Sequence, residues 1–299
     1  MKCRKHFLLV WSANNPVSQI LRRISMQYFE TKRMTDHIIR ITDRTNVFSY
    51  LVIGEERAAL IDTGTGFGDI SALTAQLTDL PIIVILTHGH CDHAGGAGSF
   101  QTVYLNRLDW DLVKESAAIS SRVQYVNATT GGRYNVTEKD LIPDRTEGYL
   151  PLEDGQIFDL GGITLEAISA AGHTQGIVCI LIKEERRIIF GDACNTVTFL
   201  WHNESSGIDV YRQNLIRLKG REREYDSVYL CHEIDEVDKH ILDDVIGVCG
   251  LILDGTDDSA DFPLIPLPQV VAAKAQGDDG LPLDGGLGNV IYDKYRVRR

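Results

Sequence analysis

The chain has 299 residues, of which 43% are hydrophobic and 24% are charged, a balance that predicts a globular protein with a sizeable core. No apolar stretch approaches the roughly 20 residues of a membrane-spanning helix, so we expect no membrane partner. The 30 Lys and Arg residues stand against 42 Asp and Glu residues and give a net charge of −12, which argues against a nucleic-acid partner.

The six cysteines lie far apart and form no CxxC pair, which favours free thiols in a cytoplasmic protein over a disulfide framework. The apolar run at 7–11 follows basic residues, as in a secretory leader, but it is too short for one. We therefore interpret residues 1–33 as an N-terminal extension and 34–299 as a single domain. Within this domain we expect an insert at 106–156 and a C-terminal tail at 251–299.

Regular patterns of apolar residues begin near residue 38 and predict a sheet with helical cover. In chain order they indicate strands at 38–41, 49–53 and 58–61, a helix at 69–77 and a strand at 82–86. The last of these is a continuous apolar run, typical of a strand that is buried on both faces.

The second half of the chain is less regular at first and then returns to short strands. In chain order the patterns indicate a helix at 109–120, strands at 163–168, 178–182, 187–190 and 227–230, and a closing strand at 289–292. Helices on either side of 227–230 are predicted from residues at helical spacing, namely Tyr211, Leu215 and Leu218 before it and Val237, Ile241 and Val245 after it.

A dense group of metal-binding side chains follows the predicted buried strand. His88, His90, Asp92 and His93 form an HxHxDH string, with four potential ligands in six residues. Imidazole and carboxylate groups suit Zn²⁺, and also iron or manganese. A solvated polar loop would rarely combine these residues at this spacing, so the string predicts a metal site.

Further motifs occur downstream and upstream of this string, each weak by itself. His173 alone would be a turn histidine, Asp192 after a glycine a turn former, and His232 a helix cap. Asp62, in an Asp-Thr-Gly segment after a strand, would likewise be a turn residue. Each motif follows a predicted strand, which favours a common site at the strand ends.

In this order the motifs resemble those of the metallo-β-lactamase-fold hydrolases, over about residues 38–250. The resemblance implies an α/β fold, the αββα sandwich of two mixed sheets flanked by helices. It also implies two divalent metal ions, with zinc as the first choice. The implied ligands are His88, His90 and His173 for the first ion, Asp92, His93 and His232 for the second, and Asp192 as the bridge. Asp62 would orient the ligand loop.

The resemblance also implies hydrolysis of a small-molecule substrate by a metal-bridging hydroxide. Asp92 would be the catalytic residue that orients the nucleophile or passes its proton to the leaving group. The bridging Asp192 is more similar to glyoxalase II-like thioesterases and lactonases than to true β-lactamases. The lactonases have a tyrosine shortly after this aspartate, whereas this chain has Asn195. We therefore expect an ester or lactone hydrolase, with a thioesterase as the alternative.

Two other classes and the quaternary state stay open at this point. Persulfide dioxygenases of the superfamily carry the same histidines around one iron, and the ribonuclease members are disfavoured by the acidic composition. The sequence leaves open whether the protein forms a homodimer. We expect the insert at 106–156 to wall the substrate pocket through Tyr125, Tyr134 and Tyr149. Trp201 and His202 either line this pocket or lie on an ordinary loop.

Overall fold

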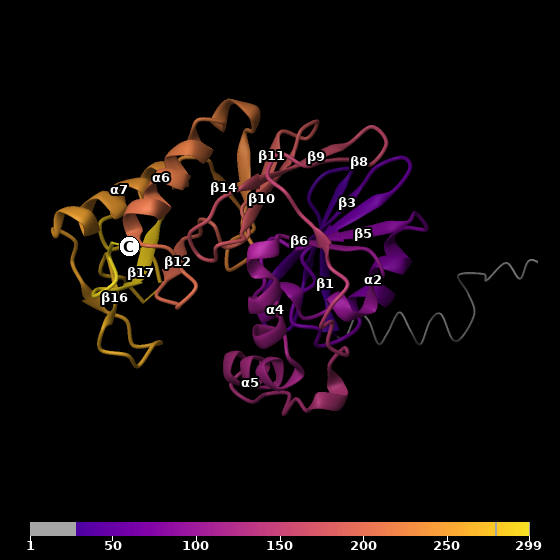
Figure 1. Ribbon diagram of the computed structural model, residues 1–299, viewed down its shortest axis with the longest axis horizontal. Helices are drawn as coiled ribbons and strands as arrows, with labels where there is room; N and C mark the ends of the chain where they lie inside the picture. The colour runs from indigo at the N-terminus through magenta and orange to yellow at the C-terminus, as the bar shows by residue number, and fades with distance from the viewer. Residues whose placement is uncertain (1–27, 279, 299) are drawn as a thin grey trace, which may run out of the picture.

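The computed structural model describes residues 28–278 and 280–298, and Figure 1 shows their arrangement in layers. The leader-like run at 7–11 and most of the predicted N-terminal extension lie outside the described residues. Residues Glu30–Arg33, which the prediction assigned to that extension, form the strand β1.

The first sheet has seven strands, and their order in the sheet follows the chain. They are β1 (Glu30–Arg33), β2 (Ile38–Thr42), β3 (Phe48–Ile53), β4 (Ala58–Ile61), β5 (Ile82–Ile85), β6 (Val103–Leu105) and β7 (Leu150–Pro151). β1 to β4 pair antiparallel, and β4 to β7 pair parallel. Parallel neighbours need a crossover, which α2 (Ile70–Leu77) supplies between β4 and β5.

The second sheet has six strands in the order β14-β13-β11-β10-β9-β8. They are β14 (Glu236–Asp238), β13 (Ser227–Tyr229), β11 (Arg187–Ile189), β10 (Val178–Ile182), β9 (Thr164–Ser169) and β8 (Ile157–Asp159). Only β11 and β13 pair parallel, so this sheet is mixed, like the first. The two sheets pack face to face through one buried cluster, in which Tyr50 and Tyr229 stack with ring centroids 5.3 Å apart.

Helices cover the outer faces of both sheets (Figure 1). α2, α3 (Cys91–Ala94) and α4 (Trp110–Ser116) lie on the side of the first sheet, and α6 (Ile208–Lys219) and α7 (Ile241–Asp254) on the side of the second. α5 (Ile119–Thr129) packs in a smaller cluster around Phe67. Short 3-10 turns complete the chain: η1 (Ala97–Ser99), η2 (Arg107–Asp109), η3 (Glu138–Asp140) and η4 (Glu222–Glu224). The predicted αββα sandwich is thereby confirmed.

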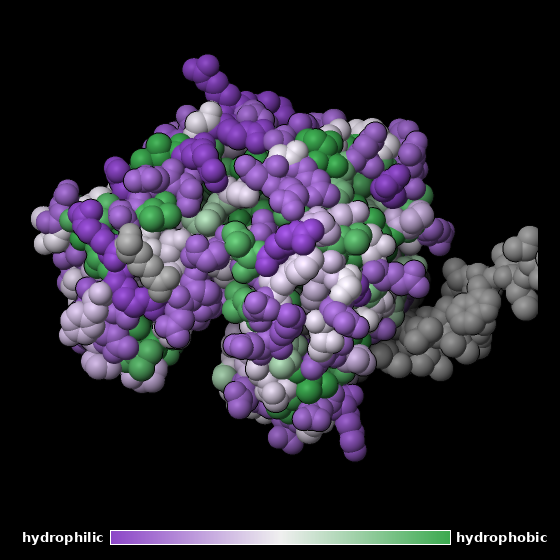
Figure 2. Space-filling view, viewed as in Figure 1, coloured by the Kyte–Doolittle hydropathy of each residue, from purple (hydrophilic) through white to green (hydrophobic). Residues whose placement is uncertain are grey.

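The C-terminal part of the chain forms a third sheet that only the strand at 289–292 had indicated. Its order is β12 (Val197–Leu200), β17 (Asn289–Asp293), β16 (Val270–Ala272) and β15 (Ala260–Asp261). β17 pairs parallel with β12, so the C-terminal tail is joined to the segment that follows β11. Figure 2 shows the molecule hollowed between this C-terminal part and the part that carries α4 and α5.

One helix prediction was wrong at its beginning. Val237 lies in β14, opposite Val228 of β13, and α7 begins only at Ile241. Spacing alone could not separate these states, because Val237, Ile241 and Val245 are all buried, the first in a strand and the others in a helix. Within the part of the chain that the structure describes, no helix is both long and apolar enough to cross a bilayer.

A fully buried arginine ties the insert to the rest of the fold. Arg122 of α5 has no exposed surface. Its guanidinium donates to the carbonyls of Ala117, Thr65, Gly95 and Ile142 and to the Asp144 carboxylate. A buried charge is tolerated when it is paired and fully hydrogen-bonded.

Replacing this guanidinium should destabilise the protein strongly. For Arg122→Ala we expect the free energy of unfolding to fall by about 3 kcal/mol or more, since the substitution leaves buried acceptors without donors. Urea denaturation measures the change. The exposed Arg133, on the same insert, supplies the control, since its alanine variant should stay within about 0.5 kcal/mol of the wild type. Equal stability of the two variants would contradict the assigned role of Arg122.

Candidate metal centre

The seven predicted ligands lie in four segments that follow strands of both sheets. The HxHxDH string follows β5, His173 follows β9, Asp192 follows β11 and His232 follows β13. The sheets meet here, because a β-bridge joins Val47 to His232 and the amide of Phe48 donates to the Cys231 carbonyl. Strand ends packed in this way hold side chains rigidly toward one place.

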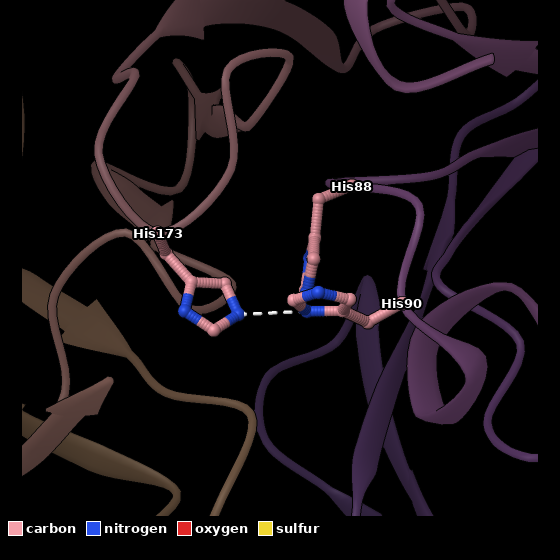
Figure 3. A group of neighbouring side chains, drawn as sticks. All are labelled: His88, His90 and His173. Atoms are coloured by element: carbon pink, nitrogen blue, oxygen red, sulfur yellow. Dashed lines mark hydrogen bonds between the residues drawn. The ribbon is translucent and has the colours of Figure 1, made fainter. Parts of the chain in front are cut away.

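The first group of side chains is His88, His90 and His173, whose ring nitrogens lie within 4.8 Å of one another. Figure 3 shows the rings converging from two segments, with 2.8 Å between His90 Nδ1 and His173 Nε2. His173 Nδ1 lies 2.7 Å from the carbonyl of Phe199, so this nitrogen carries the proton and Nε2 is left as an acceptor. His88 Nε2 is buried and has no hydrogen-bond partner among the residues that the structure describes.

The second group is Asp92, His93 and His232. His93 Nε2 lies 3.3 Å from His232 Nε2, and each of these nitrogens lies 3.8 Å from Asp92 Oδ2. Two nitrogens and a carboxylate oxygen therefore face a common point.

Asp192 lies between the two groups, and its two oxygens face different histidines. Oδ2 is 3.9 Å from His88 Nε2 and 3.5 Å from His173 Nε2. Oδ1 is 3.5 Å from His93 Nε2 and 3.2 Å from His232 Nε2. One carboxylate thus contacts both halves of the cluster, which is the arrangement that a bridging ligand requires.

Asp62 orients the ligand loop from behind, at a backbone φ of +60°. Its carboxylate accepts from the amide and hydroxyl of Thr87 and lies 2.8 Å from His93 Nδ1. The Thr87 hydroxyl is also 3.0 Å from His88 Nδ1. The contact with Nδ1 turns His93 Nε2 toward the cluster, which fits the orienting role expected for Asp62.

Two histidines of the first group, His88 and His173, are poor bases. Burial, together with the charges of His93 and His90, lowers the pKa of His88 well below its usual value. Burial also lowers the pKa of His173 to about 3, and His90 adds to this effect. Both rings are therefore neutral at pH 7 and keep their lone pairs.

The histidines of the second group differ, because carboxylates surround them. Burial opposes protonation of His93, but Asp192, Asp92 and Asp62 together raise the pKa of this ring well above its usual value. Asp192 and Asp92 likewise raise the pKa of His232 against the effect of burial. Positive charge is therefore favoured at this group, in the form of a proton or a cation.

The cluster fits divalent metal ions of the zinc class. A buried ring nitrogen without a partner, His88 Nε2, needs a Lewis acid or a donor to satisfy it. The surrounding donors are imidazole nitrogens and carboxylate oxygens, which zinc, iron and manganese accept.

Asp109 is a residue of the site that the sequence did not indicate. This carboxylate, 1% exposed, accepts from the amides of Gly89 and Gly176 and from the Thr174 hydroxyl. It therefore joins the HxHxDH loop to the loop of His173. A Cβ at Gly176 would lie 2.6 Å from the Asp109 side chain, so this close approach requires glycine.

The insert reaches the cluster through one of its three tyrosines. The Tyr125 hydroxyl donates to Asp92 Oδ2 at 2.7 Å. Tyr134 instead packs against Phe67, and the Tyr149 hydroxyl donates to the carbonyl of Arg145.

The structure also places the residues near Asp192 whose position the sequence did not decide. Asn195 donates to Asp192 Oδ1 at 3.0 Å. The His202 ring lies 5.2 Å from that of His90 and stacks on Trp201, so His202 borders the first group. Cys91, Cys194 and Cys231 are buried and carry free thiols.

Comparison with known sequences gives a family and several relatives. A family model described as the metallo-beta-lactamase superfamily matches residues 42–232. The "Atrochrysone carboxyl ACP thioesterase AgnL7" of Paecilomyces divaricatus is 30% identical over 180 residues, 58% of this chain and 46% of that protein. The "Lactamase-like protein ptaB" of Pestalotiopsis fici is 28% identical over 148 residues, 48% of this chain and 38% of that protein. The matches thus span less than half of each relative.

Solved structures show the same fold. A metallo-beta-lactamase from Pontibacter korlensis superposes with a TM-score of 0.56 at 18% identity, covering 74% of this chain and 99% of that one. A metallo-beta-lactamase family protein from Thermus thermophilus gives 0.51 at 22% identity, covering 70% and 76%. The family model spans most of the two central sheets and all four ligand segments, and the chain therefore belongs to the metallo-beta-lactamase superfamily.

Proposed function

We propose that the protein is a hydrolase that uses two divalent metal ions to cleave an ester-type bond of a small carboxylic substrate. The position of Asp192 carries the proposal, because its two oxygens face two separate groups of donors. His88, His90 and His173 would hold the first ion, and Asp92, His93 and His232 the second. When bound, such ions supply Lewis acidity and bring the pKa of a water molecule toward neutrality.

Asp92 is the residue that we propose for proton transfer. Burial opposes ionisation, but His93 and His232 hold the pKa of Asp92 below its usual value, so the group is a carboxylate at neutral pH. A carboxylate can accept a proton from the nucleophile and return it to the leaving group. The Tyr125 hydroxyl fixes its orientation from α5.

A persulfide dioxygenase with one iron is the alternative from another class, since such enzymes carry the same histidines. It differs from the proposed hydrolase in binding one ion and in consuming oxygen, whereas the hydrolase would bind a second ion at Asp92, His93 and His232. Among ester-type bonds, the thioester is a specific second candidate, since the relative AgnL7 is named as a thioesterase. Esters and lactones remain within the same proposal, because the attack on the carbonyl is common to all three.

A matched set of substrates tests the reaction. An ester, a lactone and a thioester with similar acyl groups should include at least one substrate that the metal-loaded protein hydrolyses, and a chelator should abolish the activity. Acid release at constant pH measures the rate. A protein that contains one iron, consumes oxygen with a persulfide and hydrolyses none of the three would overturn the proposal.

Neutralising the central carboxylate should weaken both ion sites. For Asp192→Asn we expect the metal content after dialysis to fall from two ions per chain, and hydrolysis to fall by on the order of 10²-fold or more, because the amide cannot bridge two cations. Elemental analysis and rate measurements on the same samples test this. Asp111→Asn, on the exposed side of α4, is the control and should change neither quantity. Two ions retained in Asp192→Asn would contradict the bridging role.

Acid should release the ions in a fixed order. Protons compete with metal for ring nitrogens. His93 and His232 have raised pKa values, so protons displace the second ion first as the pH falls. His88 and His173 have lowered pKa values, so the first ion should remain to lower pH.

Equilibrium dialysis in steps of pH, followed by elemental analysis, measures this order. Circular dichroism on each sample checks that the fold is intact. We expect a plateau at one ion per chain. Loss of both ions in one step from a folded protein would show that the two groups do not differ in this way.

A further inference from the structure

Glu204 fixes the ring of His90 from a loop outside the four ligand segments. Glu204 Oε1 lies 2.9 Å from His90 Nε2, while His90 Nδ1 faces His173 Nε2 at 2.8 Å. A carboxylate accepts only from a protonated nitrogen, so the contact places a proton on His90 Nε2 and makes Nδ1 the nitrogen that would bind an ion. This nitrogen is the one that Figure 3 shows pointing toward His173.

The loop that carries Glu204, residues 201–206 between β12 and α6, is tied to the loop of His173. Ser205 Oγ donates to the carbonyl of His173, and the Ser206 amide donates to that of Gly172. Gln175 donates to the Glu204 carbonyl. The carboxylate of Glu204 is therefore held in register with two ligands of the first group.

The C-terminal tail anchors the other end of this loop. Arg296 donates to the carbonyls of Trp201, His202 and Asn203 and to the side chain of Asn203. One guanidinium thus donates hydrogen bonds to three successive residues, in the fork geometry typical of arginine. A path of direct contacts leads from the tail through residues 201–206 to His90.

We propose that Glu204 is a positioning residue of the first ion site, which selects the His90 tautomer that can bind the ion, and that Arg296 holds Glu204 in place. This inference rests on the proposed function, since it requires an ion at His88, His90 and His173. Outer partners of metal-bound histidines change metal affinity by roughly 10- to 100-fold when they are removed. Glu204 lies in the connection between β12 and α6 and was not indicated by any motif.

Metal affinity and the His90 tautomer test the proposal together. In Glu204→Ala the affinity for the first ion, measured by competition with a chelator, should fall about 10- to 100-fold. In the metal-free protein labelled with ¹⁵N at histidine, His90 Nε2 should be protonated in the wild type and protonated to a smaller extent in Glu204→Ala. Glu204→Gln keeps an acceptor oxygen without the charge. Its affinity for the first ion should lie between those of the wild type and Glu204→Ala. Glu138→Ala, at an exposed carboxylate of η3, is the control and should change neither quantity.

Arg296→Ala should reproduce part of the loss of affinity, whereas Arg298→Ala should not, because Arg298 contacts the carbonyl of Leu253 instead. Thermal unfolding of the metal-free variants checks their folding. Wild-type protein that binds no divalent ion would end the proposed function. Wild-type protein that binds two ions, with unchanged affinity and tautomer in Glu204→Ala, would overturn only the role of Glu204.

Discussion

The site depends on one constraint, that several imidazole lone pairs must face the same small volume as two carboxylates. A ring that could rotate freely would not keep this arrangement, because rotation would point its protonated nitrogen into the volume in place of the lone pair. Four of the five histidine rings are fixed by contacts at their other nitrogens. Thr87 contacts His88, Glu204 contacts His90, Asp62 contacts His93, and the Phe199 carbonyl contacts His173. The two sheets supply strand ends rigid enough to carry these partners.

Connections outside the sheets complete this support. Asp109 joins the two ligand loops through backbone amides, and Arg122 joins the insert to the segments around Thr65 and Gly95. These two residues carry opposite charges, yet both satisfy main-chain groups that burial would otherwise leave unpaired. The insert is thus a structural part of the centre, and Tyr125 gives it direct contact with Asp92.

The side chains of the candidate metal centre could be picked out from the sequence better than the residues around them could. The HxHxDH string and the strands before each ligand could be read locally, because spacing and apolar runs are local properties. Asp109 and Glu204 had no such signal, since their partners lie 20 and 114 positions away. β15 and β16 have two and three residues, too few for alternation to be visible. Val237 matched a helical pattern that a strand and a following helix jointly produced.

The left-handed backbone at Asp62 leaves this position almost no freedom to vary. Residues other than glycine, asparagine and aspartate rarely adopt a φ of +60°. Glycine would remove the strain but would offer nothing to Thr87 and His93, and asparagine would keep the shape without the charge. Aspartate alone meets both demands. Substitutions at this single position can therefore change the backbone conformation or the negative charge separately. An exchange of a buried residue usually changes both together.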